Sequence, residues 1–170
     1  MRFLLSQLQN VASSYVEGVN HTTMTHDFCY LLRVRYAECD AQKVVFNGRY
    51  VDYVDVAVTE FTRALWGDYA ELLKKGIDNQ VVAIKLDWQA PAHFDEVLGI
   101  RVSVMRIGVS SYTLKVQFFH HATNKPLAQC EITYVVIDAE RFEKMPIPED
   151  LRASLQHGAM GVTVDHAGIG

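Results

Sequence analysis

The hydrophobic pattern of this chain changes its period once, after Gly76, and this change limits the folds that the chain can adopt. Between residues 49 and 66 the apolar side chains recur every three or four positions, which predicts one helix. The polar positions of this segment form only a narrow stripe, so we expect the helix to be buried around most of its circumference. After Gly76 apolar and polar residues alternate, as they do in strands with one buried face.

Five strands are predicted in total. One precedes the helix, and four follow it in a meander, at residues 28–36, 81–88, 97–107, 111–120 and 127–137. An antiparallel sheet that covers a largely apolar helix buries both elements. We therefore expect an α+β fold with an antiparallel five-stranded sheet wrapped around a long central helix.

The length of 170 residues fits one domain. We place this domain at residues 27–157, with an N-terminal extension at 1–26 and a flexible, Gly- and Ala-rich tail at 158–170. The extension has two interpretations. It is either a short amphipathic helix, or a stretch that precedes a true start at Met24.

Composition and charge exclude several classes of protein. The net charge of the chain is −4, whereas a nucleic-acid-binding domain usually carries a clustered positive charge. Cys29, Cys39 and Cys130 are far apart and form no CxxC pair, so we expect neither a disulfide framework nor a metal site. Free thiols fit the reducing cytoplasm. No apolar run reaches the ~20 residues of a membrane span.

The segment from Arg35 to Tyr50 reads RYAECDAQKVVFNGRY. It resembles the signature of the 4-hydroxybenzoyl-CoA thioesterase family, a D-x-x-G-x-V-x-x-x-x-Y pattern, and the resemblance continues to about residue 148. One position departs from the pattern, because Lys43 stands where the family usually has Gly. The resemblance implies a hotdog fold and a homodimer whose sheets join edge to edge, often paired again into a homotetramer. It also implies active sites at the dimer interface.

The same resemblance implies hydrolysis of an acyl- or aroyl-CoA, with Asp40 and Asn47 as the catalytic positions. The Asp40 carboxylate would act as a nucleophile or as a general base on water. The backbone N–H of Asn47, at the start of the helix, would donate to the thioester oxygen. As a side chain, Asn47 could instead cap the helix. No cofactor is expected, since coenzyme A is part of the substrate.

Other residues are candidates for substrate contact. Lys43 would place a cation near the entrance for coenzyme A, and Ser110 and Ser111 would bond the pantetheine arm. Glu38 has a second interpretation, in which it orients the loop or pairs with Arg35. The candidate substrate-binding set is Glu38, Lys43, Phe46, Val82, Ser110 and Ser111.

Three other functions remain open at this point. A hydratase of the same fold pairs a histidine with an acid, and His93 is the candidate here. A non-catalytic acyl-CoA sensor would usually carry a DNA-binding domain, for which the N-terminal segment is too short. A thioesterase acting on acyl carrier protein would need a basic docking patch. The identity of the acyl group also stays open.

Overall fold

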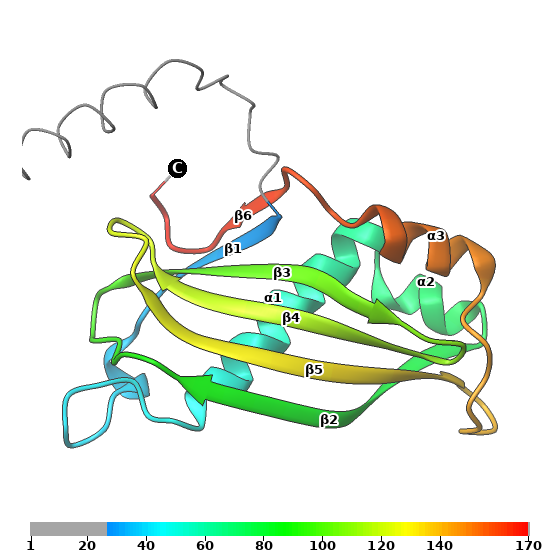
Figure 1. Cartoon of the computed structure of the whole chain (residues 1–170), viewed down its shortest axis with the longest axis horizontal. Helices are drawn as coiled ribbons and strands as arrows, with labels where there is room; N and C mark the ends of the chain where they lie inside the picture. Colours follow the sequence, from blue (N-terminus) through cyan, green and yellow to red (C-terminus); the bar gives the residue numbers. More distant parts are fainter. Residues whose placement is uncertain (1–26, 170) are drawn as a thin grey trace, which may run out of the picture.

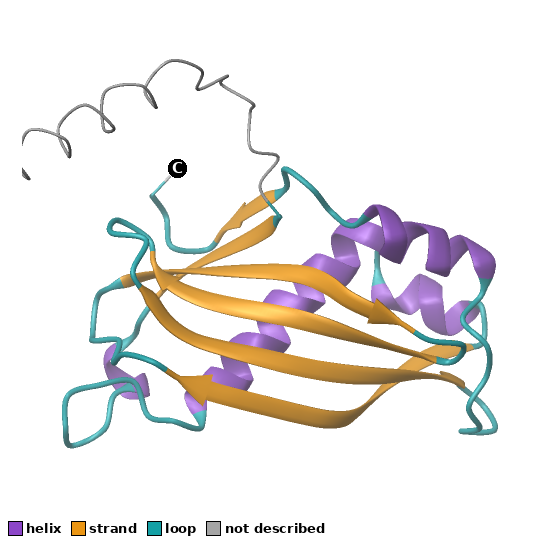
Figure 2. Ribbon diagram, in the orientation of Figure 1, coloured by secondary structure: helices purple, strands orange, loops and turns teal. Residues whose placement is uncertain are grey.

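The computed structural model describes residues 27–169, so both interpretations of the N-terminal extension concern residues outside the described part. A curved sheet lies over one face of α1, with α2 and α3 together at one end (Figures 1 and 2). The elements are β1 (Phe28–Arg33), a 3-10 helix (Tyr36–Glu38), α1 (Arg49–Trp66), α2 (Tyr69–Lys74), β2 (Ile77–Trp88), β3 (Val97–Ile107), β4 (Ser111–His120), β5 (Pro126–Asp138), α3 (Glu149–His157) and β6 (Thr163–Asp165).

The sheet corrects the prediction. It has six strands in the order β2-β5-β4-β3-β1-β6, and it is mixed, because β6 runs parallel to β1 while the other pairs are antiparallel. The helix is also short beside the strands. The 18 residues of α1 span about 27 Å, whereas the 13 residues of β5 span about 43 Å. An α+β chain is confirmed, but a five-stranded antiparallel sheet around a long helix is not.

β6 lies in the segment for which a flexible tail was predicted. The outer edge of β1 offers free backbone groups to it, and two hydrogen bonds flank the pairing, from Cys29 N–H to the Val162 carbonyl (2.9 Å) and from His166 N–H to the Leu31 carbonyl (2.9 Å). The Tyr30 hydroxyl also bonds His166 Nδ1 at 2.8 Å. Three residues carry too little periodicity to predict a strand, and only the neighbouring β1 edge defines this one.

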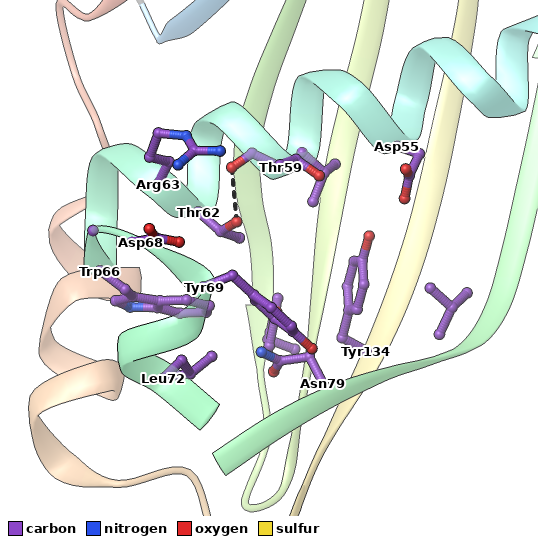
Figure 3. A pocket seen from close by; sticks show the side chains of 14 residues that line it. Asp55, Thr59, Thr62, Arg63, Trp66, Asp68, Tyr69, Leu72, Asn79 and Tyr134 are labelled. Atoms are coloured by element: carbon purple, nitrogen blue, oxygen red, sulfur yellow. Dashed lines mark hydrogen bonds between the residues drawn. The ribbon is translucent and has the colours of Figure 1, made fainter. Parts of the chain in front are cut away.

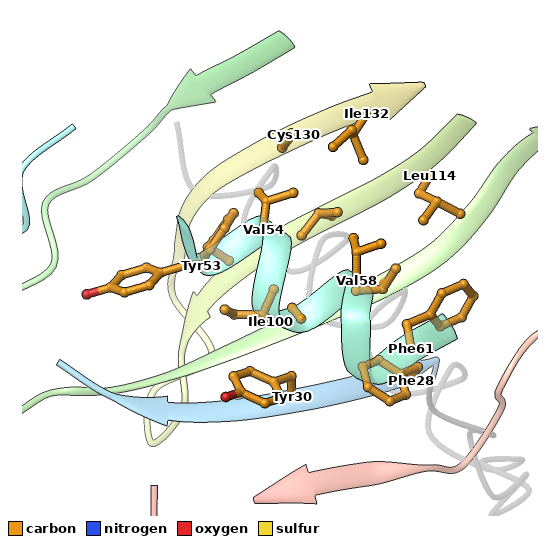
Figure 4. Close-up of a cluster of buried hydrophobic side chains, with 14 of the residues drawn as sticks. Phe28, Tyr30, Tyr53, Val54, Val58, Phe61, Ile100, Leu114, Cys130 and Ile132 are labelled. Atoms are coloured by element: carbon orange, nitrogen blue, oxygen red, sulfur yellow. The ribbon is translucent and has the colours of Figure 1, made fainter. Parts of the chain in front are cut away.

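The predicted bounds of the helix, residues 49–66, are confirmed. Its apolar face lies against the concave side of the sheet, where Val54 and Val58 face Leu114 and Ile132 (Figure 4). Gly67 ends the helix with a φ of 79°, and its N–H bonds the Arg63 carbonyl. The buried residues of α1 are Tyr50, Tyr53, Val54, Ala57, Val58 and Phe61.

β2 forms the open edge of the sheet, since it pairs only with β5. It is 12 residues long and bulges next to Val82. The side chains of Val82 and Ile84 are 57% and 42% exposed, and Val81 and Trp88 are exposed as well. A long apolar edge strand of this kind is a template for pairing with another strand.

Candidate functional site

Asp40 lies on a closed loop between the 3-10 helix and α1. Its N–H donates to the Val44 carbonyl and its carbonyl accepts from Lys43 N–H, both at 2.9 Å. The loop is fixed to the segment after β2, because Val45 N–H donates to the Ala92 carbonyl at 2.9 Å. The Asp40 Oδ1 atom accepts from Gln42 N–H at 2.8 Å, so the half-buried carboxylate is oriented by its own loop.

Lys43 occupies the position at which the family pattern has Gly, and it adopts a φ of 63°. A side chain is strained in this left-handed region, by roughly 1–2 kcal/mol, whereas Gly enters it freely. The exposed lysine therefore keeps the backbone conformation that a glycine would take, and it places a cation on the Asp40 loop.

We expect Lys43→Gly to raise the free energy of unfolding by about 0.5–1 kcal/mol, because the relief of strain exceeds the greater chain entropy of Gly. Gln42→Gly is the matched control, since Gln42 lacks the positive φ and should only lose stability. Urea unfolding of both variants measures the difference. A Lys43→Gly variant that unfolds at lower urea than the wild type would contradict the strain.

Glu38 is 5% exposed and its carboxylate is fully used inside the protein. One oxygen accepts from Arg35 Nε and Nη2, at 2.8 and 2.6 Å. The other accepts from Arg35 N–H at 2.7 Å and from the Tyr53 hydroxyl at 2.8 Å. The four lone-pair directions of the two oxygens are therefore filled. Pairing with Arg35 is the arrangement seen, and the role of Glu38 in substrate binding stays a prediction.

The Glu38 contacts tie the Asp40 loop to α1, because Tyr53 belongs to the helix and lies 15 residues away. Burial raises the pKa of the Glu38 carboxyl, but the hydrogen bonds from Arg35 and Tyr53 outweigh it and hold the pKa below its ordinary value. Burial, and then the Glu38 carboxylate, raise the pKa of the Tyr53 phenol, so Tyr53 remains the donor of this hydrogen bond.

Asn47 lies directly before Gly48, the N-cap residue of α1. The Asn47 side chain makes no capping hydrogen bond. Its backbone N–H and that of Gly48 have no acceptor among residues 27–169, while the N–H groups of Arg49, Tyr50 and Val51 all bond carbonyls three residues back. The N–H of Asn47 is thus one of the open donors at the positive end of a helix.

The other candidates lie at different places in the fold. Lys43 and Phe46 lie on the Asp40 loop, exposed to solvent. Ser110 lies in the β3–β4 turn and Ser111 begins β4, and the length of β3 separates both from that loop by roughly 35 Å within one chain. Val82 lies on the open edge of β2, between these two ends. His93 is exposed, and its Nδ1 lies 3.2 Å from Glu96 Oε1.

Sequence reasoning missed a cavity of about 350 Å³ at the far end of α1 (Figure 3). Its walls come from the last turns of α1, the start of α2, the start of β2, and Tyr112 and Tyr134 of the central strands. The first residue of α1 that lines it is Asp55, about two helical turns beyond Asn47. No pattern in the sequence marked it, because its lining residues come from segments that meet only in the folded chain. The lining residues are Asp55, Val58, Thr59, Thr62, Arg63, Trp66, Gly67, Asp68, Tyr69, Leu72, Asn79, Val81, Tyr112 and Tyr134.

Two kinds of feature are absent from residues 27–169. No group of three or more His, Cys, Asp or Glu side chains between residues 27 and 169 could hold a metal ion. Over the same residues, none of the helices has the length and hydropathy needed to cross a membrane.

Comparison with known proteins places this geometry in a family. The family model described as the thioesterase-like superfamily matches residues 34–155. Among curated proteins, the acyl-CoA thioester hydrolase YbgC of Escherichia coli is 25% identical over 129 residues, which cover 76% of this chain and 96% of that protein.

Solved structures agree on the fold. A gentisyl-coenzyme A thioesterase superposes with a TM-score of 0.67 at 26% identity, over 75% of this chain and 98% of its own. A 1,4-dihydroxy-2-naphthoyl-CoA thioesterase from Synechocystis gives a TM-score of 0.69 at 18% identity, over 76% of this chain and 95% of its own. The hotdog fold that the Arg35–Tyr50 segment implied is thereby confirmed.

Proposed function

The chain belongs to the thioesterase-like superfamily, and from this premise we propose that it hydrolyses an acyl- or aroyl-CoA to the free acid and coenzyme A. One observation carries the proposal. The Asp40 carboxylate and the open N–H of Asn47 belong to one closed loop at the start of α1. The assay is the release of free thiol from a panel of CoA esters by the wild type and by Asp40→Asn.

Asp40 is the proposed reactive group. Gln42 N–H holds its Oδ1, while Oδ2 has no hydrogen bond to any residue in the range 27–169. As a nucleophile, Oδ2 attacks the thioester carbonyl, coenzyme A leaves as the thiolate, and water then cleaves the mixed anhydride. As a general base, it takes a proton from the attacking water instead. Both routes use the same open oxygen atom.

The N–H of Asn47 is the proposed oxyanion donor. Negative charge that develops on the thioester oxygen would lie at the positive end of α1, where this N–H is unpaired. A donor of this kind is typically worth ~10²–10³ in rate. Because the donor is a backbone group, substitution of the Asn47 side chain should have a smaller effect than substitution of Asp40.

We propose a homodimer in which two β2 edges pair antiparallel. β2 starts at the end of the sheet that carries Ser111, since Gln80 and Ser111 both lie opposite Val135. It ends near the segment that holds the Asp40 loop. Antiparallel pairing therefore sets the Ser110–Ser111 turn of one subunit against the Asp40 loop of the other. This arrangement would bring Val82, Ser110 and Ser111 to the substrate, beside Lys43 and Phe46.

We expect Ile84→Lys to convert the dimer into monomers and to lower activity together with dimer content, because charges along the open edge block strand pairing. Thr163→Lys is the control, since Thr163 is exposed on the opposite edge strand, β6. Sedimentation equilibrium gives the mass of each variant. An Ile84→Lys protein that keeps twice the mass of the chain and full activity would exclude this interface.

We place the reaction in the cytoplasm. Cys29, Cys39 and Cys130 are all free thiols, which suits a reducing compartment. The proposed hydrolysis needs no cofactor, because coenzyme A enters as part of the substrate.

A further inference from the structure

A second cavity, of about 360 Å³, lies between β1 and the first turns of α1, and the proposed hydrolysis makes no use of it. Three arginines from different segments line it. Arg33 ends β1, Arg35 lies in the loop that follows, and Arg49 is the first residue of α1. Two carboxylates, those of Glu38 and Asp52, share the wall, so positive side chains are in excess there. Such a wall favours an anionic ligand.

The three guanidinium groups keep open N–H donors. Each group has five, and the described residues accept from only some of them. Arg33 and Arg49 each donate through Nη1 alone, to one neighbouring aspartate. Arg35 donates from its side chain through Nε and Nη2, to Glu38. All three arginines are exposed, so a ligand can reach the open donors. Guanidinium groups bind phosphate oxygens in pairs, which makes phosphate the best match among anions.

An exposed aromatic pair adjoins the arginines. Tyr36 and Phe94 are 82% and 55% exposed, and their rings meet edge to face with centroids 5.9 Å apart. Tyr36 directly follows Arg35 in the chain. Phe94 directly precedes Asp95, which pairs with Arg33 at 3.4 Å. The two rings and the arginine-lined cavity therefore form one surface, which we call the Tyr36 surface. Exposed rings of this kind are platforms on which a nucleobase stacks.

The Tyr36 surface is distinct from the dimer edge and from the reaction site. Three strands, β5, β4 and β3, lie between β2 and β1, so pairing of two β2 edges does not cover a cavity beside β1. Neither Asp40 nor Asn47 lines the cavity. One residue connects the two places, because Glu38 lines the cavity and also ties the Asp40 loop to α1.

We propose that the Tyr36 surface binds a nucleotide with two or more phosphate groups. The base stacks on Tyr36 and Phe94, and the phosphates bind the arginines of the cavity. Rings alone would suit an apolar partner, and arginines alone would suit a bare anion, whereas a nucleotide uses both features at once. Two sources supply this chemistry, namely the nucleotide end of coenzyme A and a free nucleotide.

Isothermal titration calorimetry of the full-length protein at low salt tests the proposal, with ADP, adenosine and inorganic pyrophosphate as probes. We expect ADP to bind at least about 10-fold more tightly than either of the others, because it alone makes both kinds of contact. Tyr36→Ala should weaken ADP binding by about 10-fold and leave pyrophosphate unchanged. Arg33→Gln and Arg49→Gln should weaken both probes by about 10-fold.

Each variant has a matched control. Phe142→Ala removes an exposed aromatic ring from the segment after β5. Arg63→Gln removes the arginine of another ion pair of α1, in which Arg63 Nε lies 3.3 Å from Glu60 Oε2. Both controls should bind ADP as the wild type does. The proposal is overturned by a wild type without saturable ADP binding. It is also overturned by ADP binding that Tyr36→Ala and Arg33→Gln leave unchanged, or that the controls weaken equally.

Hydrolysis of hexanoyl-CoA and hexanoyl-pantetheine identifies the source of the nucleotide. If the surface holds the nucleotide end of the substrate, Tyr36→Ala lowers kcat/KM for hexanoyl-CoA by about 10-fold and leaves hexanoyl-pantetheine unchanged. If it holds a free nucleotide, Tyr36→Ala cleaves both esters at wild-type rates, and ADP alters the rate on hexanoyl-pantetheine in the wild type alone. Binding is measured without hydrolysis, so a protein that binds ADP but cleaves no ester would overturn the proposed function and leave the nucleotide site standing.

Discussion

Replacement of Asp40 by asparagine is expected to lower kcat/KM for CoA-ester hydrolysis by about 100-fold or more while the protein stays folded. Asparagine has the same shape and can keep the hydrogen bond that Asp40 Oδ1 accepts from Gln42 N–H. The loop should therefore hold its conformation. The variant loses the negative charge of Oδ2. Both the nucleophilic and the general-base route require that charge.

Free-thiol release from acetyl, hexanoyl, long-chain, benzoyl and 4-hydroxybenzoyl esters of coenzyme A measures this loss. Asp52→Asn is the control, because Asp52 is an exposed carboxylate one turn into α1 that pairs with Arg49 at 2.9 Å. It should keep wild-type rates. Full activity of Asp40→Asn would mean that Asp40 is not the reactive group and that another part of the protein carries out the hydrolysis. A wild type that binds coenzyme A esters without cleaving any of them would favour the sensor, and cleavage of acyl carrier protein esters alone would favour the carrier-protein enzyme.

Replacement of Glu38 by glutamine is expected to lower the free energy of unfolding by about 2 kcal/mol and to reduce activity as well. The buried carboxylate accepts four hydrogen bonds, and an amide oxygen and nitrogen cannot accept all of them. The N–H groups of Arg35 or the Tyr53 hydroxyl then lose their acceptor. Because Glu38 ties the Asp40 loop to α1, the loss should also misplace Asp40.

The pH dependence of unfolding provides a separate signature of Glu38. Its pKa is lower in the folded protein than in the unfolded chain, so its contribution is fully present above the unfolded pKa of about 4.3. The contribution is lost as the pH falls through the folded pKa. The stability difference between wild type and Glu38→Gln should therefore be largest near pH 7 and shrink below about pH 4.

Tyr53→Phe is the graded comparison for Glu38. It removes one of the four hydrogen bonds and leaves the carboxylate paired with Arg35, so it should cost only about 1 kcal/mol. Urea unfolding at pH 7 and pH 3.5 covers all three proteins. A Glu38→Gln variant with wild-type stability at both pH values would mean that the buried network contributes nothing.

The sequence determined by itself the features that depend on near neighbours along the chain. The bounds of α1 follow from its repeat of apolar residues and from Gly67 at its end. The loop around Asp40 follows from a contiguous motif. The motif also locates the position at which Lys43 replaces the usual Gly. A Gly in a motif often marks a left-handed backbone conformation, and Lys43 adopts that conformation.

Only the tertiary structure decided which distant residues meet. β6 forms because the edge of β1 lies next to it, and the Glu38 carboxylate is enclosed because Tyr53 reaches it from α1. Trp66 and Asn79 are ordinary residues in the sequence, and only burial beside a cavity leaves their polar atoms without partners. Periodicity records which side of an element is buried, whereas a hydrogen-bond partner or a sheet neighbour depends on how the elements pack in three dimensions.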